Sequence, residues 1–200
     1  RSARAMEKGT RFGKQVAEEA WQKAEADALR NLHAAGVRVP EVYAHYENVL
    51  VMELITDALG RPAPQLAQVT NLSPAGAEEL YDQLVGQVVL MLLNDVVHGD
   101  FSPYNVLVSA QGPVVIDLPQ VVSASHNLKA CVLVERDLQS VARYLGIYSP
   151  LVKRLSREAW QVWHQHEKGT LVPEFWPALP PDPPPPDPNA PAPAARQHEP

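Results

Sequence analysis

The chain has 200 residues, of which 46% are apolar, with a formal net charge of −6 and a single cysteine, Cys131. This length suits one domain with a sizeable core, and an acidic balance without a strongly basic block argues against a nucleic-acid-binding protein. One cysteine excludes an intrachain disulfide framework, no apolar run approaches the roughly 20 residues that span a bilayer, and no signal peptide is recognisable, so we expect a cytoplasmic protein.

The first part of the chain predicts a helix followed by two strands. Residues 15–35 are rich in Ala, Glu and Lys, and Trp21, Glu25 and Leu29 recur at helical spacing, so they share one face. Gly36 is expected to end this helix. The runs VYAHY and VLVMELI, separated by EN, then predict two strands with a turn between them.

The middle of the chain predicts helices around a short hairpin. The stretch GRPAPQL, with two prolines, must be a loop. Ser73 as N-cap and Pro74 at the first helical position mark the start of a helix. The runs VLV and VVI, joined by a turn at QGP, predict a β-hairpin. Helices are expected over residues 74–94, 127–146 and 154–168.

A proline-rich segment closes the sequence. Twelve of the twenty prolines lie at or beyond Pro173. Such a composition offers too little apolar surface to offset the entropy of ordering, so we expect residues 171–200 to form polyproline II or disordered structure.

Three polar residues flank the predicted hairpin. Asp100 lies in the loop before it, Asn105 at the start of its first strand and Asp117 at the end of its second. Antiparallel pairing of the two strands brings Asn105 and Asp117 to the same end. An amide and a carboxylate side by side suit Mg²⁺, which prefers oxygen ligands and keeps several waters. Asp100 is then placed to orient a hydroxyl group or accept its proton.

Phosphoryl transfer requires such an assembly, because metal ions neutralise phosphate charge while a carboxylate positions the nucleophile. Kinases arrange it as H-x-D, then Asn, then Asp after a hairpin. Each residue alone is explained more simply by capping of backbone amides in a turn. Together, at the spacing H-G-D-x-x-x-x-N followed by I-D, they predict an α/β protein-kinase-like fold with ATP and Mg²⁺ as cofactors. His98 is expected to hold the loop by packing and hydrogen bonds.

The chain resembles the RIO-type atypical serine/threonine kinases, in particular their bacterial branch, over about residues 4–146. The matching strings are GTRFGKQV, AGVRVP, VLVMELI, PAPQL, HGDFSPYN, VVIDLPQVV and ERD, in that order. Of these, D-x-S-x-Y-N and D-L-P-Q discriminate best. The resemblance implies a partial N-lobe over residues 1–55, a reduced helical C-lobe over 56–170, and a tail over 171–200.

The resemblance also implies roles for residues of the loop and hairpin. Asp100 matches the catalytic-loop aspartate, and Ser102 is expected to support that loop. Asn105 and Asp117 match the metal ligands, with Asn105 also in the catalytic set. Asp137, in the ERD string, is expected to cap or brace the loop rather than react.

A second group of residues is matched to nucleotide binding. Glu25 matches the helix glutamate that pairs with a phosphate-binding lysine, and Met52 lies at the gatekeeper position. Glu53 and Ile55 fall in the hinge, whose backbone hydrogen-bonds adenine in the family. A solvated helix carboxylate is the simpler alternative for Glu25, although this residue shares a face with Trp21 and Leu29.

The sequence departs from the family pattern upstream of the first helix. A working kinase needs a glycine-rich loop and a strand lysine, yet no G-x-G-x-x-G and no V-A-x-K strand is present. The chain is either an N-terminally truncated fragment, which the missing initiating Met favours, or a degenerate domain. By itself it is expected to bind ATP poorly.

Three functions therefore stay open. The first is a RIO-like serine/threonine kinase or ATPase, with a protein substrate or a ribosome-related factor as partner by analogy with the family. The second is a small-molecule phosphotransferase of the aminoglycoside or choline kinase kind, which shares H-G-D-x-x-x-x-N but usually has an aromatic residue after the later Asp. The third is a non-catalytic binding module. No nucleic-acid or membrane surface is expected.

Overall fold

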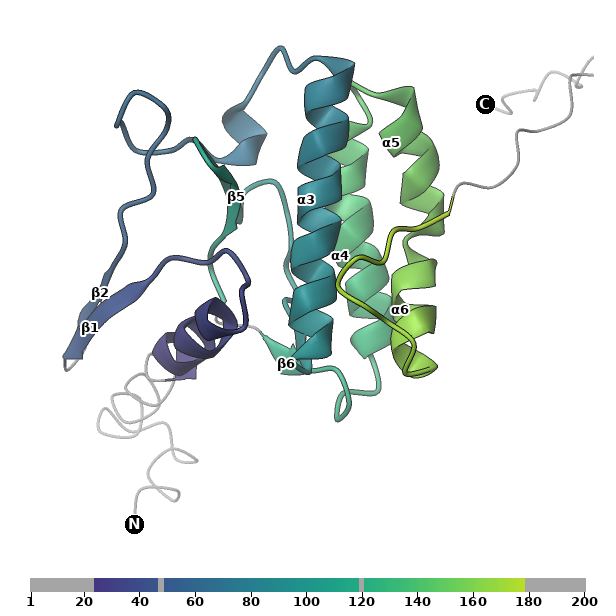
Figure 1. Cartoon of the computed structure of the whole chain (residues 1–200), viewed down its shortest axis with the longest axis horizontal. Helices are drawn as coiled ribbons and strands as arrows, with labels where there is room; N and C mark the ends of the chain where they lie inside the picture. The colour runs from purple at the N-terminus through teal and green to yellow at the C-terminus, as the bar shows by residue number, and fades with distance from the viewer. Residues whose placement is uncertain (1–23, 47–48, 119–120, 179–200) are drawn as a thin grey trace, which may run out of the picture.

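The computed structural model describes residues 24–46, 49–118 and 121–178 and has two parts joined by a hairpin. A helix over residues 24–34 and a two-stranded sheet form one part, and helices α3 to α6 form the other (Figure 1). The hairpin β4–β5 lies between them. This is the mixed α/β arrangement that the sequence predicts for a kinase-like domain.

The elements follow the predicted order closely. Their bounds are β1 Val42–Tyr46, β2 Val49–Met52, the 3₁₀ turn η1 Leu66–Gln68, α3 Pro74–Leu93, β3 Val96–Val97, β4 Val106–Ser109, β5 Gly112–Val115, β6 Val122–Ser123, α4 Ala130–Leu145, α5 Pro150–Leu155, the 3₁₀ turn η2 Ser156–Glu158 and α6 Trp160–Glu167.

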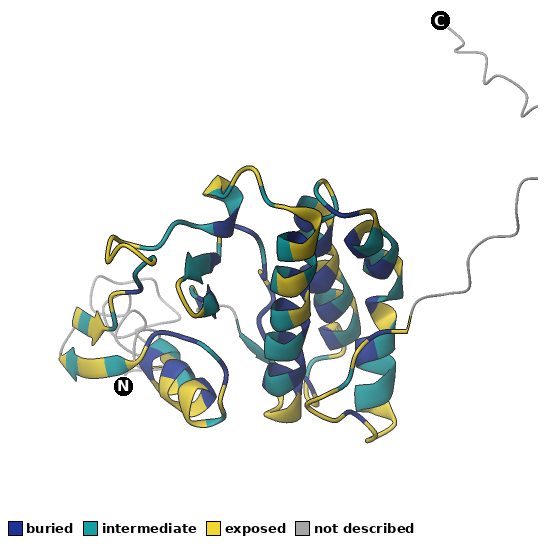
Figure 2. Cartoon of the chain, turned by 45° about the horizontal axis from the view of Figure 1, so that its top comes forward, coloured by how far each residue is buried: buried dark blue, intermediate teal, exposed yellow. Residues whose placement is uncertain are grey.

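Helix α3 is the centre of the core. Ser73 caps it as expected, because its hydroxyl accepts a hydrogen bond from the Gly76 backbone N–H at 3.1 Å and Pro74 occupies the first turn. Tyr81, Leu84 and other apolar side chains along the helix are fully buried against α4, α5 and the hairpin. Burial concentrates on the facing sides of these helices (Figure 2). Truncating Leu84 to Ala would cost about 2–5 kcal/mol of stability through the cavity left behind.

Three short antiparallel pairs of strands complete the described part. Strand β1 pairs with β2, with an irregular register between Val42 and Ala44. Strand β4 pairs with β5, placing Val106 opposite Val115. Strand β3 pairs with β6, which the sequence did not predict. The predicted first helix ends as expected, since Gly36 follows it with φ +85°, although the part of that helix before residue 24 lies outside the described residues.

Four element boundaries differ from prediction. The second strand stops at Met52 rather than including the hinge, and Gly112 and Pro113 belong to β5 rather than to the turn. Helix α4 begins at Ala130, three residues late. The helix expected over residues 154–168 instead begins at Pro150, after the Ser149 N-cap, and is broken into α5, η2 and α6.

The start of the proline-rich segment packs on the helices. Leu171 is buried, and the Trp176 ring meets the Tyr81 ring edge-on at 5.9 Å. Gln161 of α6 exchanges two hydrogen bonds with the Ala178 backbone, at 2.9 and 3.0 Å. The expectation of a tail without packed structure therefore fails for residues 171–178. Residues 179–200 lie outside the described residues, and the division into lobes stays a prediction. No helix among the described residues is long and apolar enough to cross a membrane.

Candidate active site

The loop between β3 and β4 carries Asp100, and a buried carboxylate of α4 holds this loop by hydrogen bonds. Asp137 of α4 accepts hydrogen bonds from the backbone N–H groups of Gly99 at 2.8 Å and Phe101 at 3.2 Å. Burial raises the pKa of Asp137, while these two hydrogen bonds and nearby charges pull it back. The predicted bracing role of Asp137 is confirmed. Gly99 has φ +81°, a conformation that a side chain would strain.

His98 ties the same loop to the exit of the hairpin. Its Nδ1 accepts the Asp100 backbone N–H at 3.2 Å, so its Nε2 carries the proton and donates to the Ile116 carbonyl at 3.1 Å. The side chain is only 2% exposed, and burial lowers its pKa, partly offset by the Ile116 carbonyl and by the charges of Asp137, Asp100 and Asp117. His98 therefore holds the loop by burial and hydrogen bonds, as the sequence predicted.

Asn105 and Asp117 meet at the open end of the hairpin, as antiparallel pairing requires. The Ile116 backbone N–H donates to the Asn105 carbonyl at 3.0 Å, directly beyond the Val106–Val115 pair. The Asn105 side-chain Nδ2 donates to the Asp100 carbonyl at 2.9 Å and to the Asp100 carboxylate at 3.2 Å. This orients the amide so that its oxygen is the atom left to face a cation.

Asp117 adopts an unusual backbone conformation, with φ 63°. Such a conformation is uncommon for residues other than glycine and indicates that the surroundings impose it. Here both backbone groups of the preceding residue are held, its N–H by Asn105 and its carbonyl by His98. The Asp117 side chain is exposed, as is that of Asp100.

Glu25 lies within electrostatic reach of this end of the hairpin. Burial raises its pKa, and the negative charge of Asp117 raises it further. Within the described part of the chain Glu25 forms no ion pair. The role predicted for Glu25, pairing with a phosphate-binding lysine, stays a prediction beside the simpler interpretation of a solvated helix carboxylate.

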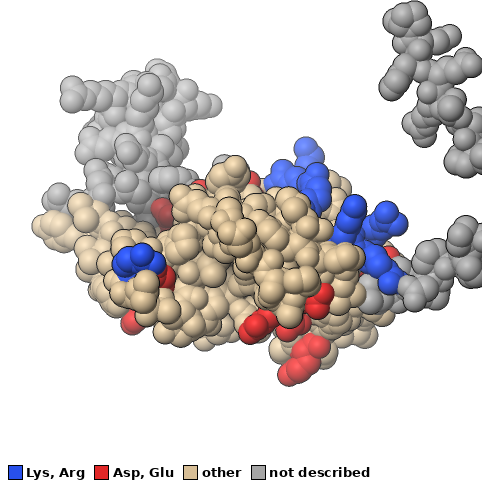
Figure 3. Space-filling model, turned by 90° about the horizontal axis from the view of Figure 1, so that it is seen from above, with Lys and Arg blue, Asp and Glu red and all other residues tan. Residues whose placement is uncertain are grey.

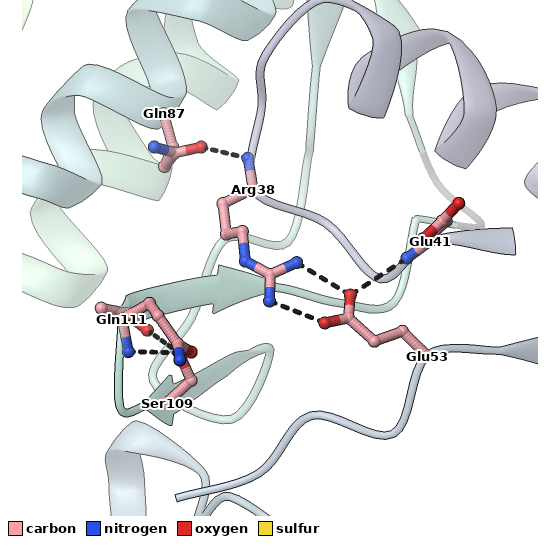
Figure 4. A network of polar contacts seen from close by, with 7 residues as sticks. Arg38, Glu41, Glu53, Gln87, Ser109 and Gln111 are labelled. Atoms are coloured by element: carbon pink, nitrogen blue, oxygen red, sulfur yellow. Dashed lines mark hydrogen bonds and ion pairs between the residues drawn. The ribbon is translucent and has the colours of Figure 1, made fainter. Parts of the chain in front are cut away.

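The predicted hinge is held by an ion pair that the sequence did not predict. The Arg38 guanidinium donates to both carboxylate oxygens of Glu53 at 2.8 Å, and Gln87 of α3 accepts the Arg38 backbone N–H at 2.6 Å (Figure 4). The Arg38 carbonyl in turn accepts the Val115 backbone N–H at 2.9 Å. Arg38 thus joins the hinge, α3 and the hairpin, and only its place in the AGVRVP string could have suggested this.

The backbone of the predicted hinge residues Glu53 and Ile55 is only partly hydrogen-bonded. Glu53 donates its N–H to the Glu41 carbonyl at 2.8 Å, and Ile55 is buried and accepts the Ala63 N–H at 2.9 Å. Among the described residues, the Glu53 carbonyl and the Ile55 N–H make no hydrogen bond. Met52 is partly exposed beside them. One donor and one acceptor, on residues two positions apart, are therefore available. The roles predicted for Met52, Glu53 and Ile55 stay predictions.

The possible metal ligands are few, but they suit a hard cation such as Mg²⁺. The described residues contain no group of three His, Cys, Asp or Glu side chains placed to hold a metal. Mg²⁺ does not need one, because it keeps several waters and commonly takes one or two carboxylates together with substrate phosphates. The Asn105 oxygen and the exposed Asp117 carboxylate meet that requirement. A hollow of about 560 Å³ lies elsewhere, between α3, the hairpin turn and residues 173–176, and contains none of the predicted catalytic or metal-binding residues.

Comparison with known proteins gives the family. The model of the RIO domain matches residues 1–154. A serine/threonine-protein kinase rio2 of Schizosaccharomyces pombe is 36% identical over 117 residues, covering 58% of this chain and 31% of that protein. The RIO-type serine/threonine-protein kinases Rio1 of Thermoplasma acidophilum and Haloferax volcanii are 36% and 37% identical, each over 62% of this chain and over 62% and 41% of their own lengths.

The chain therefore spans between about a third and three fifths of the length of these relatives. The family model, by contrast, covers most of the chain and includes the loop, the hairpin and Asp137. With the geometry described above, this shows that the chain belongs to the RIO domain family.

Proposed function

We propose that this domain transfers a phosphoryl group from ATP to a serine or threonine hydroxyl of a protein. The observation that carries the proposal is the joining of Asp100, Asn105 and the exit of β5 by direct hydrogen bonds, on a loop fixed by Asp137. Phosphoryl transfer depends on positioning and electrostatics rather than covalent chemistry, so a rigid loop of this kind is what the reaction needs.

Each residue has a distinct task in this proposal. Asp100 presents an exposed carboxylate that orients the acceptor hydroxyl and accepts its proton. Asn105 and Asp117 would hold Mg²⁺, which when bound neutralises charge on the phosphate oxygens. The Glu53 carbonyl and Ile55 N–H would pair with the adenine edge, beside Met52.

The position of Glu25 near Asp117 is consistent with the proposed phosphoryl-transfer site. The Asp117 charge is one cause of the raised pKa of Glu25, so these two carboxyl groups lie within electrostatic reach of each other. These 200 residues contain no glycine-rich loop and no V-A-x-K strand. The chain by itself is therefore expected to bind ATP weakly, and the proposal concerns the catalytic half of the site.

The proposal is tested by the metal dependence of nucleotide binding. Calorimetry with ATP, with and without Mg²⁺, is expected to show tighter binding with the metal for the unaltered chain, and Asp117→Ala should remove that difference. Asp82→Ala, which changes an exposed aspartate on α3, serves as the matched control. Equal metal dependence in the unaltered chain and in Asp117→Ala would contradict the proposal, as would metal-dependent phosphate transfer to a protein by Asp117→Ala.

Three finer expectations remain predictions. A cytoplasmic location depends on cysteine usage, and the bacterial branch depends on matched strings alone. A ribosome-related partner depends on analogy with the family and has no support in the site itself.

A further inference from the structure

Helix α4 presents one exposed face made of basic and neutral residues. Its exposed positions are Val132, Arg136, Gln139 and Arg143, which recur at intervals of three and four residues and so form a single line along the helix. The opposite face, with Val134, Leu138, Val141 and Leu145, is buried in the core. No acidic residue occupies the exposed line.

The line continues from the end of α4 onto the next elements. Two small hollows, of about 270 and 180 Å³, are both lined by Arg143 and Ser156. The first also contains Lys153, and the second also contains Gln139 and Arg157. We call the exposed residues Arg136, Gln139, Arg143, Lys153 and Arg157, together with the half-buried Ser156, the basic stripe.

Gly146, directly after α4, allows α5 to pack closely against the end of that helix. A Cβ at this position would lie 2.7 Å from the Ala142 carbonyl oxygen and 3.2 Å from the Lys153 Cα. Both neighbours are backbone atoms, so they could not move aside cheaply. The glycine therefore lets the Lys153 backbone lie against the end of α4, where Lys153 and Arg143 line the same hollow.

Arg136 pairs with Asp137 at 3.5 Å, but the other cations of the stripe have no such partner among the described residues. Across residues 24–46, 49–118 and 121–178, Arg143, Lys153 and Arg157 take part in no ion pair. The whole chain has a net charge of −6, so composition alone does not explain a cluster of cations. Seen from above, Lys and Arg side chains gather at one side of the helical part, while several Asp and Glu side chains line the opposite edge (Figure 3).

The other end of the stripe is attached to the catalytic loop. Arg136 donates a hydrogen bond to the Gly99 carbonyl and keeps 53% of its side chain exposed. Gly99 precedes Asp100 directly. Arg143 lies seven residues further along α4, which corresponds to a rise of about 10 Å. The stripe therefore begins beside Asp100 and leads away from it.

We infer that the basic stripe docks an acidic acceptor polypeptide and guides its hydroxyl to Asp100. This inference rests on the proposed function, whose substrate class it names. An extended peptide advances about 3.3 Å per residue. Its Asp, Glu or phosphorylated side chains should therefore begin about three residues from the acceptor hydroxyl and continue to about six.

RNA is the less suitable occupant of this surface. The stripe itself contains no aromatic side chain, and Trp160, three residues beyond Arg157, offers a single exposed ring, whereas surfaces that bind single-stranded RNA stack successive bases on several aromatic side chains. Guanidinium groups, in contrast, pair well with the carboxylates or phosphate groups of a peptide.

The test measures peptide binding without requiring turnover. A fluorescent serine peptide with glutamates three to six residues on both sides of the serine is compared with the same peptide carrying glutamines. At low salt the acidic peptide should bind more tightly, and Arg143→Ala combined with Arg157→Ala should weaken it roughly five- to tenfold. Arg61→Ala removes an exposed arginine outside the stripe and should leave peptide affinity unchanged.

The outcomes separate this inference from the proposed function. The inference would be overturned if the acidic and the glutamine peptide bound equally well. It would also be overturned if Arg61→Ala weakened binding of the acidic peptide as much as the Arg143→Ala, Arg157→Ala double variant does. Tighter binding of a single-stranded RNA of similar length with the same dependence on Arg143 and Arg157 would overturn it as well. Loss of affinity with added salt in the unaltered protein would support it without any variant. A failed Asp117 test leaves all these measurements interpretable, because none of them involves ATP.

Discussion

Asp137 and Gly99 lie 38 residues apart in the sequence, yet the Asp137 carboxylate accepts the Gly99 backbone N–H at 2.8 Å. The other carboxylate oxygen accepts the N–H of Phe101 at 3.2 Å. The residue between these two donors is Asp100. One buried side chain of α4 thus fixes the loop on both sides of the predicted catalytic carboxylate, which connects the packing of the helical part to the geometry of the site.

Asp137→Asn should destabilise the fold, because asparagine keeps only one acceptor oxygen and leaves one of these N–H groups buried without a partner. The expected loss is about 1–3 kcal/mol in the free energy of unfolding. Urea denaturation measures it. Asp82→Asn, on the exposed side of α3, should leave stability unchanged. A similar small effect in both variants would mean that Asp137 does not brace the loop.

His98 predicts a dependence of stability on pH. Burial lowers its pKa in the folded state below the value of 6.5 that the unfolded chain shows. The unfolded chain therefore takes up the proton first, and stability is lost as pH falls from about 6.5 through the folded pKa. Unfolding free energies measured between pH 5 and 7.5 should show a smaller slope in His98→Gln. Identical slopes would show that His98 does not titrate with folding.

The electrostatic link between Glu25 and Asp117 can be measured directly. Burial and the Asp117 charge both raise the pKa of Glu25, so Asp117→Asn should lower that pKa part of the way back toward 4.5. A titration followed by carboxyl carbon NMR reports it. Asp100→Asn should have the smaller effect, because Asp100 does not contribute to the shift of Glu25. A larger effect of Asp100→Asn would place Glu25 elsewhere.

The ion pair between Arg38 and Glu53 should couple hinge and core. A double-mutant cycle with Arg38→Ala and Glu53→Ala is expected to give a coupling of about 1 kcal/mol, because the pair is bidentate and half-buried. Hydrogen bonds from Arg38 lower the pKa of Glu53, so the contribution is present above pH 4.5 and is lost as pH falls through the lower folded value. The coupling should therefore vanish in acid. A coupling independent of pH would contradict this account.

Periodicity and cap residues predicted most of the fold. The helix after Ser73, the hairpin before Asp117 and the helix containing Asp137 all appear close to their expected places, because local spacing decides which face of each can be buried. The breaks between α5, η2 and α6 were missed. No capping side chain marks the start of η2 or of α6. The apolar residues of this segment would share one face in a continuous helix as well as in a broken one.

The sequence by itself determined that Asn105 and Asp117 would share one end of a hairpin, because alternating strands joined by a short turn have only one register that buries their apolar side chains. It could not determine which distant groups would hold that end. The contact of Asp137 with Gly99 and the pairing of Arg38 with Glu53 were decided only by how the elements pack together. Such contacts join residues far apart in the chain, and only the close packing of the whole core fixes their distances.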